Sequence, residues 1–72
     1  MIPLVLADVG KNVVIIKIGG SLEVKHHLEN IGFVAGDTIQ VLSSLKGNVI
    51  VSVKGIRVAI SEEMARKIMV AA

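Results

Sequence analysis

Two alternating stretches dominate the pattern of apolar and polar positions along the chain. In residues 49–54 and again in residues 56–60, apolar side chains recur at every second position. Because successive side chains of a β-strand point to opposite faces, this period of two predicts two half-buried strands. Val49, Val51 and Val53 are expected to point inward, with polar side chains and Ile50 outward.

Three further strands are predicted from β-branched runs bounded by turn residues. Residues 12–18 end at a glycine pair, residues 38–44 follow the turn Gly36-Asp37, and residues 68–71 form a last short strand. Ile39 and Val41 are expected to point inward. Residues 45–48 indicate a hairpin turn in which Gly47 and Asn48 supply the positive φ.

Both faces of the strand at residues 12–18 carry apolar side chains. Alternation therefore divides its residues between two faces, and the choice of the inward face is an interpretation. We interpret Val14, Ile16 and Ile18 as one face, directed inward. Val13 and Ile15 then lie on the outer face, as do Leu42 and Ile50 elsewhere. If such residues cluster, they favour a contact surface over chance scatter.

Two helices are predicted from capping residues. Ser21 is a candidate N-cap for a helix of about ten residues that ends at Gly32, where a helix terminus needs left-handed backbone. Leu28 and Ile31, together with Val24, are expected to face the sheet. Ser61, followed by two acidic residues, starts a second helix of one to two turns.

These elements predict one mainly β domain over residues 1–72 with two short helices. Residues 1–11 form an entry segment in which Leu4, Leu6 and Val9 pack. The connections between residues 38 and 60 are too short for parallel crossovers. A small barrel of five to six strands, with a helix inserted after the first main strand, removes exposed edges and is the architecture we expect.

The composition favours a protein partner and argues against nucleic acid. The chain is 53% hydrophobic, has no cysteine, and has Phe33 as its single aromatic residue. This apolar fraction exceeds the usual 45–50%, so we expect part of it to remain exposed and to meet a partner or another copy of the chain. The net charge of +2 comes from scattered basic residues, which together with the lack of aromatic stacking residues argues against nucleic acid.

The chain shows no membrane or secretion signal. No segment approaches the ~20 apolar residues of a membrane span. The N-terminus lacks the basic region of a signal peptide and reaches Asp8 early. We therefore expect a cytoplasmic protein that does not insert into the membrane.

Catalytic and metal chemistry have few candidates. Ser21, Glu23 and His27 are close in sequence, but a helical turn splays them outward with no pocket, so we expect no enzyme and no cofactor. His26 and His27 point about 100° apart on a helix and cannot share an ion. Glu23 and His27 are four residues apart, so their side chains could share a metal ion. Stable metal sites use three or four ligands, and we therefore interpret both histidines as solvated.

At the level of the whole chain, the order of these pieces resembles the FeoA family. The matching pieces are Gly19-Gly20, the segment from Leu28 to Ile39 with its two glycines, the segment 51–63, and the close Ile68-Met69-Val70. The resemblance implies an SH3-like β-barrel. It also implies a small cytosolic partner that binds the membrane GTPase subunit of a bacterial ferrous iron transporter and modulates iron uptake.

The chain departs from the family pattern at two positions. His26-His27 replace the frequent arginine before Leu28, and Ala35 replaces a frequent proline, which should loosen the turn. We place the docking surface on the helix and on the outer strand face. Its residues are Lys25, His26, His27, Leu28, Val13 and Ile15. The alternatives are a regulatory module of a metal-dependent repressor and a nucleic-acid-binding barrel.

Overall fold

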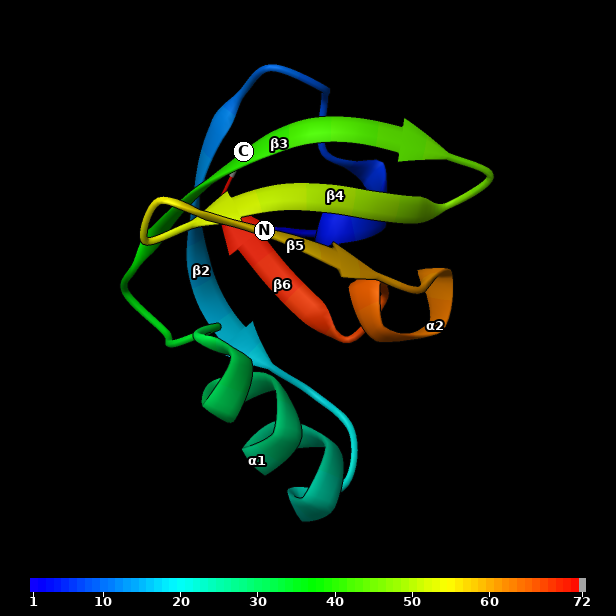
Figure 1. The fold of residues 1–72 in the computed structure, drawn as a ribbon. Coiled ribbons are helices and arrows are strands. Elements are labelled where there is room, and N and C mark those ends of the chain that lie inside the picture. The colour runs from blue at the N-terminus through cyan, green and yellow to red at the C-terminus, as the bar shows by residue number, and fades with distance from the viewer. Residues whose placement is uncertain (72) are drawn as a thin grey trace.

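The computed structural model describes residues 1–71, which form six strands, two α-helices and one 3-10 turn (Figure 1). The strands are β1 (Ile2–Pro3), β2 (Asn12–Ile18), β3 (Thr38–Leu45), β4 (Asn48–Val53), β5 (Ile56–Ile60) and β6 (Ile68–Ala71). The helices are η1 (Leu4–Leu6), α1 (Leu22–Ile31) and α2 (Glu62–Ala65). The mainly β architecture and the helix inserted after the first main strand are confirmed.

All strands belong to one antiparallel sheet in the order β1-β6-β2-β3-β4-β5. The sheet curls but does not close, because β1 and β5 pair on one side only within the described residues. The expectation of a barrel without edges is therefore wrong in this detail. The turn η1 packs against both β6 and α2, so these two elements lie beside the gap that pairing leaves open.

The core is built from aliphatic side chains of every strand except the two-residue β1, with one buried residue each from η1, α1 and α2 and with Phe33 from the connection between α1 and β3. Leu4, Leu28, Phe33 and Ala65 are fully buried in it. The strands supply Val13, Ile15, Ile39, Val41, Val49, Val51, Val53, Ile60, Ile68 and Val70. The inward positions predicted for residues 39, 41, 49, 51 and 53 are confirmed.

The facing predicted for β2 is wrong for residues 13–16 and correct for Ile18, which packs against the core. Val13 and Ile15 are buried at 4% and 0% exposure, whereas Val14 and Ile16 are exposed. The reason is a bulge against β6, where Ile15 lies opposite Val70 but Lys17 lies opposite Met69, which leaves Ile16 without a partner. A bulge inserts one residue into the alternation, so Ile18 returns to the same side as Ile15 and strict alternation fails.

Both helix starts are confirmed. The Ser21 hydroxyl accepts a hydrogen bond from the Val24 backbone N–H at 3.2 Å, and the Ser61 hydroxyl accepts one from Met64 at 3.3 Å. Each bond satisfies one backbone donor that the first helical turn leaves without an internal partner.

The end of α1 is confirmed at Gly32, which has φ 125°. The Phe33 N–H donates to the Leu28 carbonyl at 3.0 Å, and the Gly32 N–H donates to Glu29 at 3.1 Å. This pair of bonds is the Schellman motif, and its accompanying apolar contact is supplied by Leu28 and Phe33, both fully buried. The motif thus fixes where the chain leaves α1 and enters the core.

Three apolar residues predicted to pack are exposed instead. Leu6 and Val9 are 66% and 56% exposed, and Ile31 is 37% exposed. Leu6 ends a single 3-10 turn whose inward position is already filled by Leu4. Ile31 is the last residue of α1, a helix in which Leu28 is the one buried residue and Val24 packs against the core as predicted.

The two hairpin turns have the same design. Lys46-Gly47 joins β3 to β4 and Lys54-Gly55 joins β4 to β5, and both residues of each pair have positive φ. Positive φ at both central positions defines the type I′ turn. The prediction of positive φ at Asn48 is wrong, because Lys46 has the positive φ and Asn48 is the first residue of β4. The side-chain Oδ1 of Asn48 accepts a hydrogen bond from the Glu62 N–H at 3.0 Å.

Candidate interaction surface

The helix α1 projects from the sheet at the bottom of Figure 1. Leu28 is its only buried residue, while Lys25, His26 and His27 are all exposed. Leu28 was predicted as a docking residue, but its side chain has 0% exposure. It anchors the helix to the core, and the neighbouring Lys25, His26 and His27 form the accessible part of the predicted surface.

Backbone contacts hold α1 at both ends. Before the helix, the Gly19 N–H donates to the Lys67 carbonyl at 2.6 Å, which ties this connection to the start of β6. After the helix, the Gly36 N–H donates to Ile15 at 2.7 Å, and the Ile15 N–H donates to Asp37 at 2.9 Å. These hydrogen bonds hold both ends of α1 to the sheet, so the position of its exposed side relative to the sheet is fixed.

Exposed apolar side chains accompany the basic and imidazole groups of α1. Leu22, the first residue of the helix, is 68% exposed, and Ile31 and Val34 are 37% and 39% exposed. Sequence reasoning missed Leu22, although its place directly after the N-cap, outside the spacing of Val24 and Leu28, was a usable signal. The helix thus combines apolar and titratable groups.

The outer face of the sheet carries a second apolar group on β2. Val14 and Ile16 are 37% and 44% exposed, and Val14 lies directly opposite the half-buried Ala71 of β6. Val13 and Ile15, which were predicted to line this face, lie on its reverse side in the core. Of the other residues predicted outward, Ile50 is 39% exposed and Leu42, at a bulge of β3, is half-buried.

The candidate metal pair Glu23 and His27 is not extended by a third ligand. Across residues 1–71, no group of three or more histidine, aspartate or glutamate side chains is placed to hold a metal ion. Two exposed side chains on one helix are fewer than the three or four ligands of stable sites.

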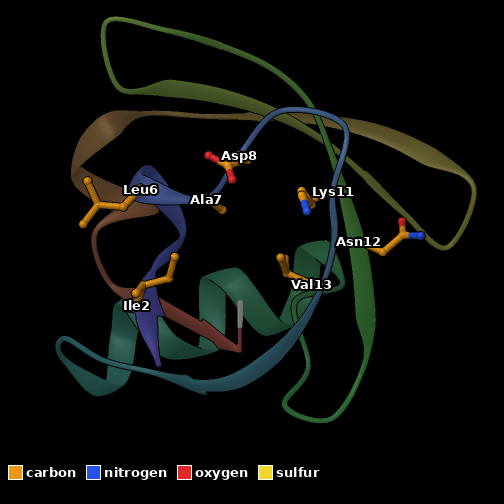
Figure 2. Close-up of a pocket in the computed structure, with 7 residues that line it drawn as sticks. All are labelled: Ile2, Leu6, Ala7, Asp8, Lys11, Asn12 and Val13. Atoms are coloured by element: carbon orange, nitrogen blue, oxygen red, sulfur yellow. The ribbon is translucent and has the colours of Figure 1, made fainter.

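A small pocket lies between the N-terminal segment and the start of β2 (Figure 2). Its volume is about 160 Å³, and its lining residues are Ile2, Leu6, Ala7, Asp8, Lys11, Asn12 and Val13. Cofactor and drug-sized ligand pockets span roughly 300–1,000 Å³, so this one is too small for them. Its charged groups, Asp8 and Lys11, are exposed at the surface. The pocket holds no nucleophile paired with a base.

None of the ion pairs within residues 1–71 includes a residue of α1. Lys54 pairs with Asp37 at 3.6 Å, Arg66 with Glu62 at 3.0 Å, and Lys67 with Glu63 at 3.9 Å. The last two join residues four apart around α2 and its C-terminal end. Exposed pairs of this kind contribute about 0–1 kcal/mol each, so they add little to the stability of the domain.

No helix within residues 1–71 is long and apolar enough to cross a membrane.

Comparison with known proteins agrees with the fold and covers nearly the whole chain. The model of the FeoA domain matches residues 2–72. A Methanocaldococcus jannaschii protein with the provisional name "Fe(2+) transport protein A" is 36% identical over 70 residues, which cover 97% of this chain and 85% of that protein.

Solved structures give the same result. A crystal structure described as the iron uptake regulatory protein FeoA superposes with a TM-score of 0.87 at 34% identity, covering 97% of this chain and 93% of the other. The manganese-activated repressor ScaR also shares the fold, with a TM-score of 0.86 at 20% identity, but the match covers 34% of that chain.

The FeoA model matches residues 2–72 of this chain, and the 36% identity to the relative extends over 97% of this chain and 85% of that protein. The SH3-like fold with α1 inserted after β2 is the fold of the FeoA structures. The chain therefore belongs to the FeoA domain family.

Proposed function

We propose that this protein is a non-enzymatic module of a ferrous iron transport system that binds the cytosolic GTPase region of the membrane transporter and modulates it. The observation that carries the proposal is the FeoA match over residues 2–72. The names of two relatives, which refer to Fe(2+) transport and iron uptake regulation, support the choice of system.

The docking surface in this proposal is the exposed side of α1. Lys25, His26 and His27 supply hydrogen-bond donors, and Leu22 supplies apolar contact area at 68% exposure. Interfaces combine apolar contacts with a polar rim, and this helix offers both on one element.

Modulation requires that the module distinguish two transporter states. A bound protein shifts a conformational equilibrium only by its difference in affinity for the two states. The proposal therefore predicts that affinity for the GTPase domain depends on the bound nucleotide, and that the GTPase rate changes on binding.

The direct experiment is titration of this protein with the purified GTPase domain of its transporter, with binding and GTP hydrolysis measured together. Replacing Lys25, His26 and His27 by alanine should weaken binding by about tenfold or more. Each replacement removes an exposed side chain from a helix that Leu28 still anchors, so the fold is retained.

A matched control replaces the exposed Ser43, Ser44 and Lys46 of the β3–β4 hairpin by alanine, and it should bind like the unmodified protein. If the unmodified protein shows neither binding nor a change in GTPase rate with any nucleotide, the proposal is wrong. If both triple variants bind normally, the transporter is the partner but α1 is not the surface.

A second candidate is a regulatory module acting on a metal-dependent repressor. Its support is that the manganese-activated repressor ScaR shares this fold, as does a structure described as "T. acidophilum IdeR", with a TM-score of 0.84 at 26% identity. The match covers 32% of that chain, against 93% of the FeoA structure, so the transporter module is preferred. Genes beside this one separate the two, since a transporter gene favours the first and a repressor gene the second.

A further inference from the structure

The strand β5 is an open edge of the sheet. It pairs with β4 through five residue pairs, from Val53 opposite Ile56 to Val49 opposite Ile60, and it has no strand on its other side in residues 1–71. An open edge presents backbone N–H and C=O groups that another strand can pair with.

The register shows which backbone groups face outward. Val53 and Ile56 flank the two-residue turn Lys54-Gly55, so they form a hydrogen-bonded pair. Hydrogen-bonded and non-hydrogen-bonded pairs alternate along an antiparallel ladder. Arg57 and Ala59 are therefore non-hydrogen-bonded toward β4, and their N–H and C=O groups point to the open edge.

Exposure agrees with this assignment. Arg57 and Ala59 are both exposed, and Ile56 at the start of the strand is 65% exposed. No turn or loop hydrogen bond within the described residues involves the backbone of Arg57 or Ala59. Four backbone groups therefore lie in a row beside an exposed isoleucine.

The residues of β5 are complementary to a second β5 running antiparallel. A two-fold axis at Val58 places Arg57 opposite Ala59 of the other copy and Ile56 opposite its Ile60. The outward groups of Arg57 and Ala59 then face each other and form four hydrogen bonds. A register shifted to centre on Arg57 would place the two guanidinium groups opposite each other, which is unfavourable.

The other end of the sheet does not offer an equivalent edge. β1 has two residues, and one of them is Pro3, which has no N–H to donate. Head-to-tail pairing of β5 with β1 of another copy would therefore gain little. Pairing through β5 alone is isologous and stops at two chains.

We propose that β5 is a self-association edge, through which two copies of this chain form an antiparallel β5–β5 dimer centred on Val58. This inference is independent of the transporter proposal. Because a five-residue edge buries less than the ~1,000 Å² expected of a stable interface, we expect a weak dimer that forms only at high protein concentration.

The test is sedimentation of the purified protein over a concentration series, together with amide hydrogen exchange at Arg57 and Ala59. A monomer–dimer equilibrium is expected, with both amides protected more strongly as concentration rises. Ala59→Pro removes an N–H that no bond inside the chain uses, so it should keep the unfolding midpoint and weaken dimerisation by about tenfold or more.

Two further substitutions at the same exposed position separate edge pairing from other contacts. Ala59→Ser keeps the N–H and should dimerise like the unmodified chain. Ala59→Glu places a carboxylate opposite Arg57 of the other copy twice, so it should tighten the dimer by roughly 2- to 30-fold at low salt.

Two results would overturn the inference. One is a monomer at millimolar concentration with Arg57 and Ala59 amides that exchange freely. The other is a dimer that forms equally well with Ala59→Pro and Ala59→Glu, because that dimer would use a different surface. If Ala59→Pro unfolds, the Ala59→Glu comparison and the amide protection still decide the question.

Discussion

Lys46 and Lys54 adopt left-handed backbone with φ of 53° and 51°, a conformation that residues with a side chain seldom take. Each precedes a glycine that also has positive φ. The turn geometry overrides the preference of the residue, because a type I′ turn matches the twist of the strands it joins. At the scale of the residue, the need for a two-residue type I′ turn therefore outweighs the preference of lysine for negative φ.

Gly32 is the position where a side chain would cost most at the end of α1. Its φ is 125°, and an added Cβ would lie 3.1 Å from Cγ1 of Val53. Gly32→Ala should lower the free energy of unfolding by about 1–3 kcal/mol, measured by urea denaturation, since strained backbone and crowding add together.

Gly36→Ala is the matched control, because Gly36 has a similar φ of 95° but nothing within 4 Å of its Cβ position. It should lose less stability than Gly32→Ala. Equal losses would show that backbone strain alone accounts for both and that the contact with Val53 is harmless.

The strand β2 shows how one irregularity reverses the interpretation of an element. The bulge at Ile16 places Val13, Ile15 and Ile18 on one side although their spacing is two and then three. The bounds of β2 were predicted correctly over residues 12–18, but its two faces were exchanged over residues 13–16, before the bulge. Ile18, after the bulge, was correctly predicted to face inward. Both faces carry β-branched residues, so composition could not correct the error.

Alanine substitution along β2 checks this orientation. Ile15→Ala should lower the free energy of unfolding by about 2–5 kcal/mol, because it empties a fully buried site. Ile16→Ala, at 44% exposure, should cost less than about 1 kcal/mol. Chemical denaturation of both variants measures the difference, and a larger loss at Ile16 would contradict the bulged register.

The whole molecule depends on how the gap between β1 and β5 is filled. The single turn η1 lies against β6 and α2, and its Leu4 is fully buried. The side-chain oxygen of Asn48 in β4 accepts a hydrogen bond from the backbone N–H of Glu62, the first residue of α2, which lies 14 residues further along the chain. Side chains and one polar contact thus complete a core that strand pairing leaves open.

Leu4→Ala tests this role of η1. It should lower the free energy of unfolding by about 2–5 kcal/mol, which is comparable to the 3–5 kcal/mol that a core of this size supplies. We therefore expect a largely unfolded protein by circular dichroism. Leu6→Ala, two residues away at 66% exposure, should remain folded. Unfolding of both variants would contradict the assignment, because burial of Leu4 would then not be what distinguishes the two positions.

The sequence by itself determined the five strands from β2 to β6, the helix caps, the glycine stop at residue 32 and the family, because these depend on local backbone preference and on short-range order. It also placed Lys25, His26 and His27 on an exposed helix. The spacing of the helix also predicted that Leu28 faces the sheet, where it is buried. The sequence did not predict β1, which lies in the segment interpreted as an entry segment. Only the tertiary structure decided that Val13 and Ile15 are buried, that Leu6 is exposed and that β5 keeps an open edge. Those outcomes depend on bulges and on which strands meet, and neither is encoded in the period of two that marks a strand.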